Sequence, residues 1–163
     1  MKNIDSYGLK ICAFQADLFE KSASNLLCSS RIFVRRFMYS DLASRLDLNG
    51  YVFEASSIED AFDELDRQYG KTEYGHQKYS AEEMHWIGYM YRYWAYTYEQ
   101  SSKHLFKYIK PEKLRALYFP YHSLDPAQAI DRILESKGTD EKDQIARGVE
   151  IMRKIRKKYD DLK

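Results

Sequence analysis

The chain has 163 residues, of which 44% are hydrophobic and 31% are charged, a balance typical of a folded globular domain and not of a disordered chain. Its 26 Lys and Arg residues and 25 Asp and Glu residues leave a net charge of +1, so the overall charge does not favour a nucleic-acid or membrane surface. Only Cys12 and Cys28 are present, which excludes a disulfide framework and predicts a reducing compartment.

The distribution of apolar residues predicts no membrane-directed segment. The N-terminal residues form no long apolar run, so we expect no signal peptide. The longest apolar-rich stretch contains Arg92, Glu99 and Lys103, and we therefore expect no helix that spans a bilayer. The expectation is one helical domain over residues 1–163, located in the cytoplasm.

Hydrophobic spacing in the first half of the chain predicts helices joined by short links. Apolar residues fall three and four apart in most of this region, and Ser57 with Asp60 resembles a capping box at a helix start. "YVFEA" has strand-like composition but is short and has no evident partner. The expected elements are helices over 4–21 and 25–39, a short helix through 46, an extended segment over 51–55 and a helix over 57–69.

The second half of the chain is dominated by one long helical pattern. Ser80 and Glu83 form a second capping box, and the pattern after them continues to Ile109, about 45 Å at 1.5 Å per residue. Pro111 favours the first position of a new helix, which Pro120 is expected to end. Further helices are expected over 126–137 and 140–162. The predicted fold is all-α, a single irregular bundle of about six or seven helices around the long central helix.

The last expected helix carries a narrow apolar stripe. Its members recur with near-heptad spacing, interrupted by Gly148. The stripe consists of Ile145, Met152, Ile155, Tyr159 and Leu162.

Aromatic residues concentrate in the central helix. Residues 85–109 contain six of the fifteen tyrosines and both tryptophans, on nearly every side of the helical wheel. Such a helix is typical of a buried centre, but Tyr and Trp also anchor protein interfaces. The two interpretations can coexist. The residues expected to contact a partner, where exposed, are Tyr89, Tyr91, Arg92, Tyr96, Tyr98 and Tyr121.

The sequence lacks the motifs that would indicate a cofactor site or a metal site. The chain has no Gly-rich phosphate loop and no HExxH sequence. Glu82 and His85 form one E-x-x-H, whereas a di-iron bundle needs two on different helices. The four histidines are dispersed along the chain. We expect neither a cofactor nor a metal.

Arg115 and His122 form the one pattern with a catalytic interpretation. Their R-x6-H spacing resembles the motif of HEPN ribonucleases, in which the Arg would stabilise a charged phosphate transition state and the His would move or position a proton. The chain departs from that family in having Ala116 after the Arg and Pro120 between the pair. A HEPN-like ribonuclease toxin is therefore the alternative function, and an exposed helix charge beside a loop histidine is favoured over it.

Two small basic clusters allow a third hypothesis. Residues 153–158 read "RKIRKK", and Arg31, Arg35 and Arg36 lie close together. Either cluster could contact nucleic acid or an acidic partner, although a solvated helix face is the favoured interpretation.

The segment from Tyr79 to Ile133, above all "YFPYHSLDPAQAI", resembles a small uncharacterised family of helical bacterial proteins. That family resembles components of toxin–antitoxin-like cassettes encoded beside ADP-ribosyltransferase-like proteins. The resemblance implies a non-enzymatic antitoxin or accessory protein, with a Tyr-rich face that docks on an ADP-ribosyltransferase-like toxin. It supplies no catalytic residues. A homo-oligomer is compatible with these expectations.

Overall fold

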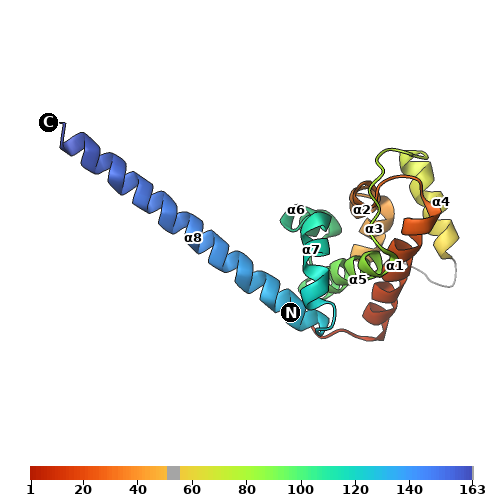
Figure 1. Cartoon of the computed structure of the whole chain (residues 1–163). Helices are drawn as coiled ribbons and strands as arrows, with labels where there is room; N and C mark the ends of the chain where they lie inside the picture. The colour runs from red at the N-terminus through yellow and green to blue at the C-terminus, as the bar shows by residue number, and fades with distance from the viewer. Residues whose placement is uncertain (51–55, 163) are drawn as a thin grey trace. The chain divides into compact units, whose positions relative to one another are not determined.

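A computed structural model describes residues 1–50 and 56–162, except for the side chain of residue 141. These residues form eight helices and no strand, which confirms the all-α class (Figure 1). The predicted extended segment over 51–55 lies outside the described residues. The helices are α1 (Ser6–Asn25), α2 (Ser30–Met38), α3 (Asp41–Asp47), α4 (Ile58–Tyr69), α5 (Ala81–Tyr98), α6 (Ser102–Tyr108), α7 (Pro111–Tyr121) and α8 (Pro126–Asp160).

The chain divides into two compact units. The first, Met1–Ser123, contains α1 to α7, and the second, Leu124–Lys163, contains α8. The expectation of one helical domain over 1–163 concerns cooperative folding and stays a prediction. Within the described residues, no helix combines the length and the apolar character needed to cross a membrane.

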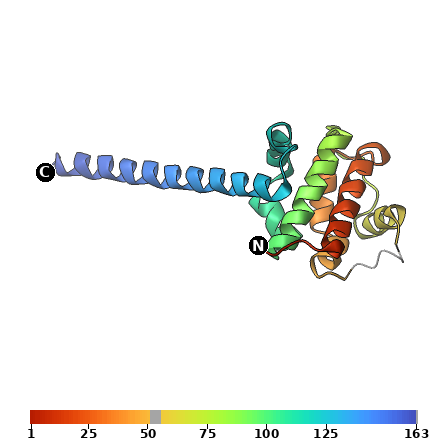
Figure 2. The same cartoon turned by 90° about the horizontal axis from the view of Figure 1, so that it is seen from below.

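The first unit is organised around α1 and α5, which lie side by side in both views (Figures 1 and 2). Their close approach depends on two glycines. A Cβ at Gly88 would lie 2.8 Å from both the Gln15 carbonyl oxygen and the Phe19 ring, and one at Gly8 would lie 2.6 Å from the Tyr96 ring. Because a side chain at either site would overlap its neighbour, glycine sets the spacing of this helix pair.

Helices α4 and α5 both begin at the capping box that the sequence predicts. The Ser57 hydroxyl accepts a hydrogen bond from the Asp60 amide at 3.2 Å, and the Asp60 carboxylate accepts one from the Ser57 amide at 2.9 Å. Ser80 and Glu83 make the same reciprocal pair at the start of α5. Both capping boxes are confirmed, because each satisfies backbone donors that have no partner within the helix.

The predicted thirty-residue central helix is wrong, because the helix ends at Tyr98. Glu99 takes a left-handed conformation with φ 53°, and the Gln100 amide bonds back to the Ala95 carbonyl at 3.0 Å. Ser101 then accepts a hydrogen bond from the His104 amide and begins α6. The central aromatic helix is therefore the eighteen-residue α5.

The predicted break at Gly138 is also wrong, whereas the helix expected to end at Pro120 ends one residue later, at Tyr121. Pro120 lies in the last turn of α7, where the carbonyl left without a donor belongs to the exposed Ala116. α8 runs through Gly138 and Gly148 without a break, since a glycine inside a helix costs only about 1 kcal/mol. The two helices expected over 126–137 and 140–162 are therefore one helix.

The link between α1 and α2 also differs from its prediction. α1 continues to Asn25 and α2 begins only at Ser30, whose predecessor Ser29 accepts a hydrogen bond from the Ile32 amide. Leu27, expected on the apolar stripe of the second helix, lies in the link and is exposed.

Substituting Gly88 tests the close packing of α1 and α5. We expect Gly88→Ala to lower the free energy of unfolding by roughly 1–3 kcal/mol, because its methyl group overlaps the Gln15 backbone. Gly138→Ala is the matched control, since a Cβ there meets no atom within 4 Å and should stabilise the helix by up to about 1 kcal/mol. Urea unfolding followed by circular dichroism measures both, and an unchanged Gly88→Ala stability would contradict the packing.

Candidate functional site: an aromatic hollow on the first unit

The predicted docking residues divide between the interior and the surface. Tyr91, Arg92 and Tyr96 are buried, whereas Tyr89, Tyr98 and Tyr121 are partly exposed. The Tyr91 hydroxyl donates to the Ile109 carbonyl at 2.6 Å, and the Tyr96 hydroxyl donates to Asp5 at 2.7 Å. Tyr91, Arg92 and Tyr96 therefore belong to the core, and they are removed from the set of candidate contact residues.

Burial and the Asp5 carboxylate both raise the pKa of the Tyr96 hydroxyl. Desolvation, followed by its hydrogen bond to Asp5, raises the pKa of Tyr96 to about 12. Hydrogen bonds from the Gly8 amide and then from the Tyr96 hydroxyl lower the pKa of Asp5. Both groups therefore keep the protonation states that their shared hydrogen bond needs at neutral pH.

Arg92 is the centre of a buried polar network. Its side chain is 1% exposed, and its Nε donates to the Gln15 Oε1 at 2.7 Å. One terminal nitrogen donates to Asp47 Oδ1 at 2.7 Å and the other to Ser102 Oγ at 2.8 Å. Asp47 also accepts the Ser102 amide and hydroxyl at 2.9 and 2.7 Å. The network joins α1, α3, α5 and the start of α6.

Arg115 lies within α7 and His122 caps the C-terminus of the same helix, but the two residues have different partners. Seven residues is nearly two helical turns, so the pair shares one side of α7 and its C-terminus. The Arg115 Nε donates to Glu83 at 2.9 Å, and its guanidinium lies 4.4 Å from the centre of the Tyr79 ring. The His122 ring stacks on Tyr118 at 4.6 Å. Arg115 is thus held at the start of α5.

His122 lies at an aromatic hollow of about 420 Å³ on the first unit. Trp86 and Tyr118 meet edge to face at 5.8 Å, and Tyr89 extends the aromatic wall along α5. This aromatic hollow is lined by Glu20, Glu82, His85, Trp86, Tyr89, Tyr118 and His122. It combines the ring surface expected of a docking site with two carboxylates at its edge.

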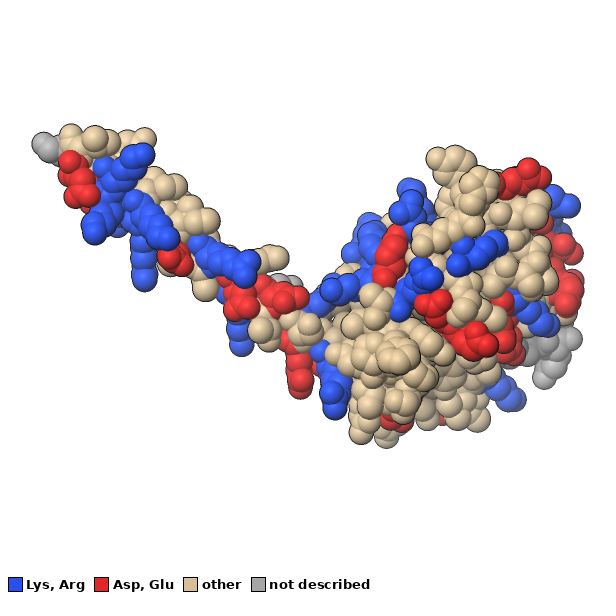
Figure 3. Space-filling view, viewed as in Figure 1, with Lys and Arg blue, Asp and Glu red and all other residues tan. Residues whose placement is uncertain are grey.

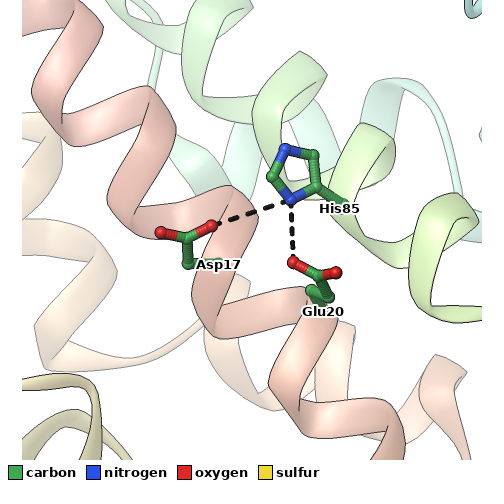
Figure 4. Close-up of side chains that lie close together, drawn as sticks. All are labelled: Asp17, Glu20 and His85. Carbon is green, nitrogen blue, oxygen red and sulfur yellow. Dashed lines mark hydrogen bonds and ion pairs between the residues drawn. The ribbon is translucent and has the colours of Figure 1, made fainter.

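His85 ties the aromatic hollow to α1. Its Nδ1 lies 3.2 Å from Glu20 Oε2 and 3.7 Å from Asp17 Oδ1, with all three side chains about half-exposed (Figure 4). A protonated imidazole here would offset two carboxylates that lie one turn apart on α1. With a neutral imidazole, the three ligand atoms, which lie within 4.8 Å of one another, could share a divalent cation.

The N-terminal basic cluster is largely engaged within the protein. Arg31 pairs with Glu112 at 3.2 Å, and Arg36 donates to the Gly70 carbonyl at 3.2 Å while lying over the Tyr69 ring. These contacts favour the solvated-face interpretation over a nucleic-acid surface.

Comparisons with protein-family models, with curated proteins and with solved structures find no match to this chain.

Removing Arg92 tests the buried network. We expect Arg92→Ala to lower the free energy of unfolding by roughly 3–5 kcal/mol, because the buried Gln15 oxygen would lose its donor and the Asp47 carboxylate would lose its charge partner. Arg35→Ala, at an exposed position on α2, should change it by less than about 0.5 kcal/mol. Chemical denaturation of both variants measures the difference, and equal effects would show that the network contributes little.

The link between α5 and α7 predicts a pH dependence. Burial tends to raise the pKa of Glu83, but hydrogen bonds from Ser80 and Arg115 outweigh it and hold the pKa below its ordinary value. A lowered folded pKa contributes stability above the unfolded pKa, which is lost as pH falls through the folded value. Wild type should therefore exceed Glu83→Gln in stability at neutral pH, with the difference shrinking in acid. A pH-independent difference between their unfolding curves would contradict this.

Proposed function

We propose that the protein is a non-enzymatic interaction module that binds a partner protein at the aromatic hollow. In the narrower form of the proposal, it is an antitoxin or accessory component of a bacterial toxin–antitoxin-like system in the cytoplasm. Its partner is then an ADP-ribosyltransferase-like toxin. Two features support this proposal: the exposed rings of the aromatic hollow, and the family resemblance of residues 79–133.

The chemistry of the aromatic hollow favours a basic side chain as the group it binds. Trp86, Tyr89 and Tyr118 offer ring surface that attracts a guanidinium or ammonium group. Glu20 and Glu82 add negative charge at the same place. An Arg or Lys on the partner would therefore find both cation–π and ion-pair contacts, the combination common at interface centres.

A HEPN-like ribonuclease using Arg115 and His122 is the second proposal. One observation favours it: α7 continues through Pro120 to Tyr121, so that its C-cap residue His122 lies on the same side of the helix as Arg115. The Glu83 contact opposes it, because an Arg already paired with a carboxylate is less available to phosphate.

Binding to an ADP-ribosyltransferase-like protein of the kind that the family resemblance implies tests the first proposal. We expect a stoichiometric complex that Trp86→Ala weakens by about tenfold or more, because the ring wall is lost. Glu82→Lys, a change at an exposed helix position, should weaken it similarly by reversing the charge at the edge. Titration calorimetry with purified proteins gives both affinities.

Tyr74→Ala is the control for these variants, since Tyr74 is 75% exposed and lies outside the aromatic hollow. Its affinity should equal that of wild type. Equal affinities for all four proteins would contradict docking at the aromatic hollow, and no complex at all would contradict the antitoxin role. RNA cleavage by wild type that is lost in both Arg115→Ala and His122→Ala would support the ribonuclease instead.

A further inference from the structure

The outer part of α8 carries an apolar face with no cover within its own unit. From Thr139 to Leu162, every side chain that the structure describes is exposed. Among them are seven large apolar residues, each between 46% and 75% exposed. An apolar stripe of this length on a helix is typical of an interaction surface. The residues are Ile145, Val149, Ile151, Met152, Ile155, Tyr159 and Leu162.

The spacing of this stripe is that of a coiled-coil seam. Ile145, Met152 and Tyr159 recur every seven residues and take the first core position of the heptad, a. Gly148 and Ile155 each follow three residues later and take the second core position, d, and Leu162, two residues beyond the end of α8, continues this spacing. Val149 and Ile151 lie beside these positions and widen the apolar face.

The pattern complements itself when two copies run in opposite directions. With the symmetry point between residues 153 and 154, each a position of one copy faces a d position of the other. Ile145 then lies opposite Leu162 of the second copy, and Met152 lies opposite its Ile155. Each layer of the seam therefore contains one a residue from one copy and one d residue from the other.

Gly148 provides the strongest evidence for the antiparallel direction. In this alignment it lies opposite Tyr159 of the second copy, so the largest residue of the stripe faces the position with no side chain. A Cβ at Gly148 meets no atom within 4 Å, which leaves space there for an incoming ring. A parallel pair in register would instead set two glycines against each other and leave a void.

Charge favours the same direction. Lys and Arg side chains gather along one side of the outer part of α8, with uncharged surface beside them (Figure 3). A parallel pair would hold the basic residues 153–158 of both copies side by side. In the antiparallel alignment the cations beside the seam, Arg156 and Lys158, flank the apolar Val149 and Ile151 of the second copy.

We propose that the outer part of α8 binds a second copy of this chain in an antiparallel two-helix coiled coil centred between Arg153 and Lys154. This surface is separate from the aromatic hollow of the first unit, so the dimer and the partner complex can be tested independently.

Sedimentation equilibrium of the full chain over a hundredfold concentration range tests the dimer. Wild type should approach twice the mass of one chain. Ile155→Asp should weaken association by about tenfold or more, because it places a carboxylate in the apolar seam. Ala146→Asp is the matched control on the outer side of the same helix and should associate like wild type. Circular dichroism at a concentration where wild type is monomeric checks that the variants fold alike.

Cysteine cross-linking tests the direction of the pair. Met152→Cys and Ile155→Cys should form a disulfide with each other when the two variants are mixed, and much less when each is alone. A parallel pair would cross-link each variant with itself. Buried Cys12 and Cys28 should not compete, and desolvation raises the pKa of the Cys12 thiol to about 12, which lowers its reactivity.

Three results would overturn the proposal. The first is a monomer at every concentration, and the second is equal association of wild type and Ile155→Asp. The third is self-linking of each single cysteine variant in place of the mixed pair. A monomeric chain that floats with anionic vesicles, or that binds the ADP-ribosyltransferase-like protein through Ile155, would assign the stripe to that other occupant.

Discussion

The close packing of α1 against α5 is the constraint on which the first unit depends. Glycine at position 88 lets the two backbones approach, and the same contact brings the Gln15 side-chain amide to the Gly88 carbonyl at 3.1 Å. The Gln15 oxygen then accepts from Arg92, which continues the network to Asp47 and Ser102. One helix pair thus fixes the position of α3 and the start of α6. Without this spacing, the guanidinium would be a buried charge with too few acceptors.

The same pair explains where the proposed docking surface lies. α5 is aromatic nearly all round, but α1 and the α6 region cover much of it, so Tyr91 and Tyr96 serve the core. The N-terminal half of α5 leaves Trp86 and Tyr89 partly exposed, and the Tyr118 ring from α7 contacts the Trp86 ring. The aromatic hollow is therefore the part of the aromatic helix that the fold leaves uncovered. The core interpretation of this helix holds for Tyr91, Arg92 and Tyr96, and the recognition surface stays a proposal for Trp86 and Tyr89.

Structural features that depend only on residues within one helical turn could be predicted from the sequence. The capping boxes at Ser57 and Ser80 were read directly, because each depends on two residues three apart. The left-handed Glu99 was missed, since a non-glycine residue there is selected by the tertiary contacts of Ser102 with Asp47. Burial of Arg92 was not predictable either, because its acceptors come from three distant segments. The cluster of Asp17, Glu20 and His85 was not predicted, because it forms only where α1 packs against α5.

Two surfaces carry the proposals: the aromatic hollow, supported by α1 and α5, and the exposed apolar stripe of α8. Hydrogen exchange followed by mass spectrometry, at low and at high protein concentration, tests this account most directly. We predict strong, concentration-independent protection in α1 and α5, and protection over residues 139–162 that rises with concentration. Equal protection of residues 139–162 at both concentrations, or weak protection of α5, would contradict it.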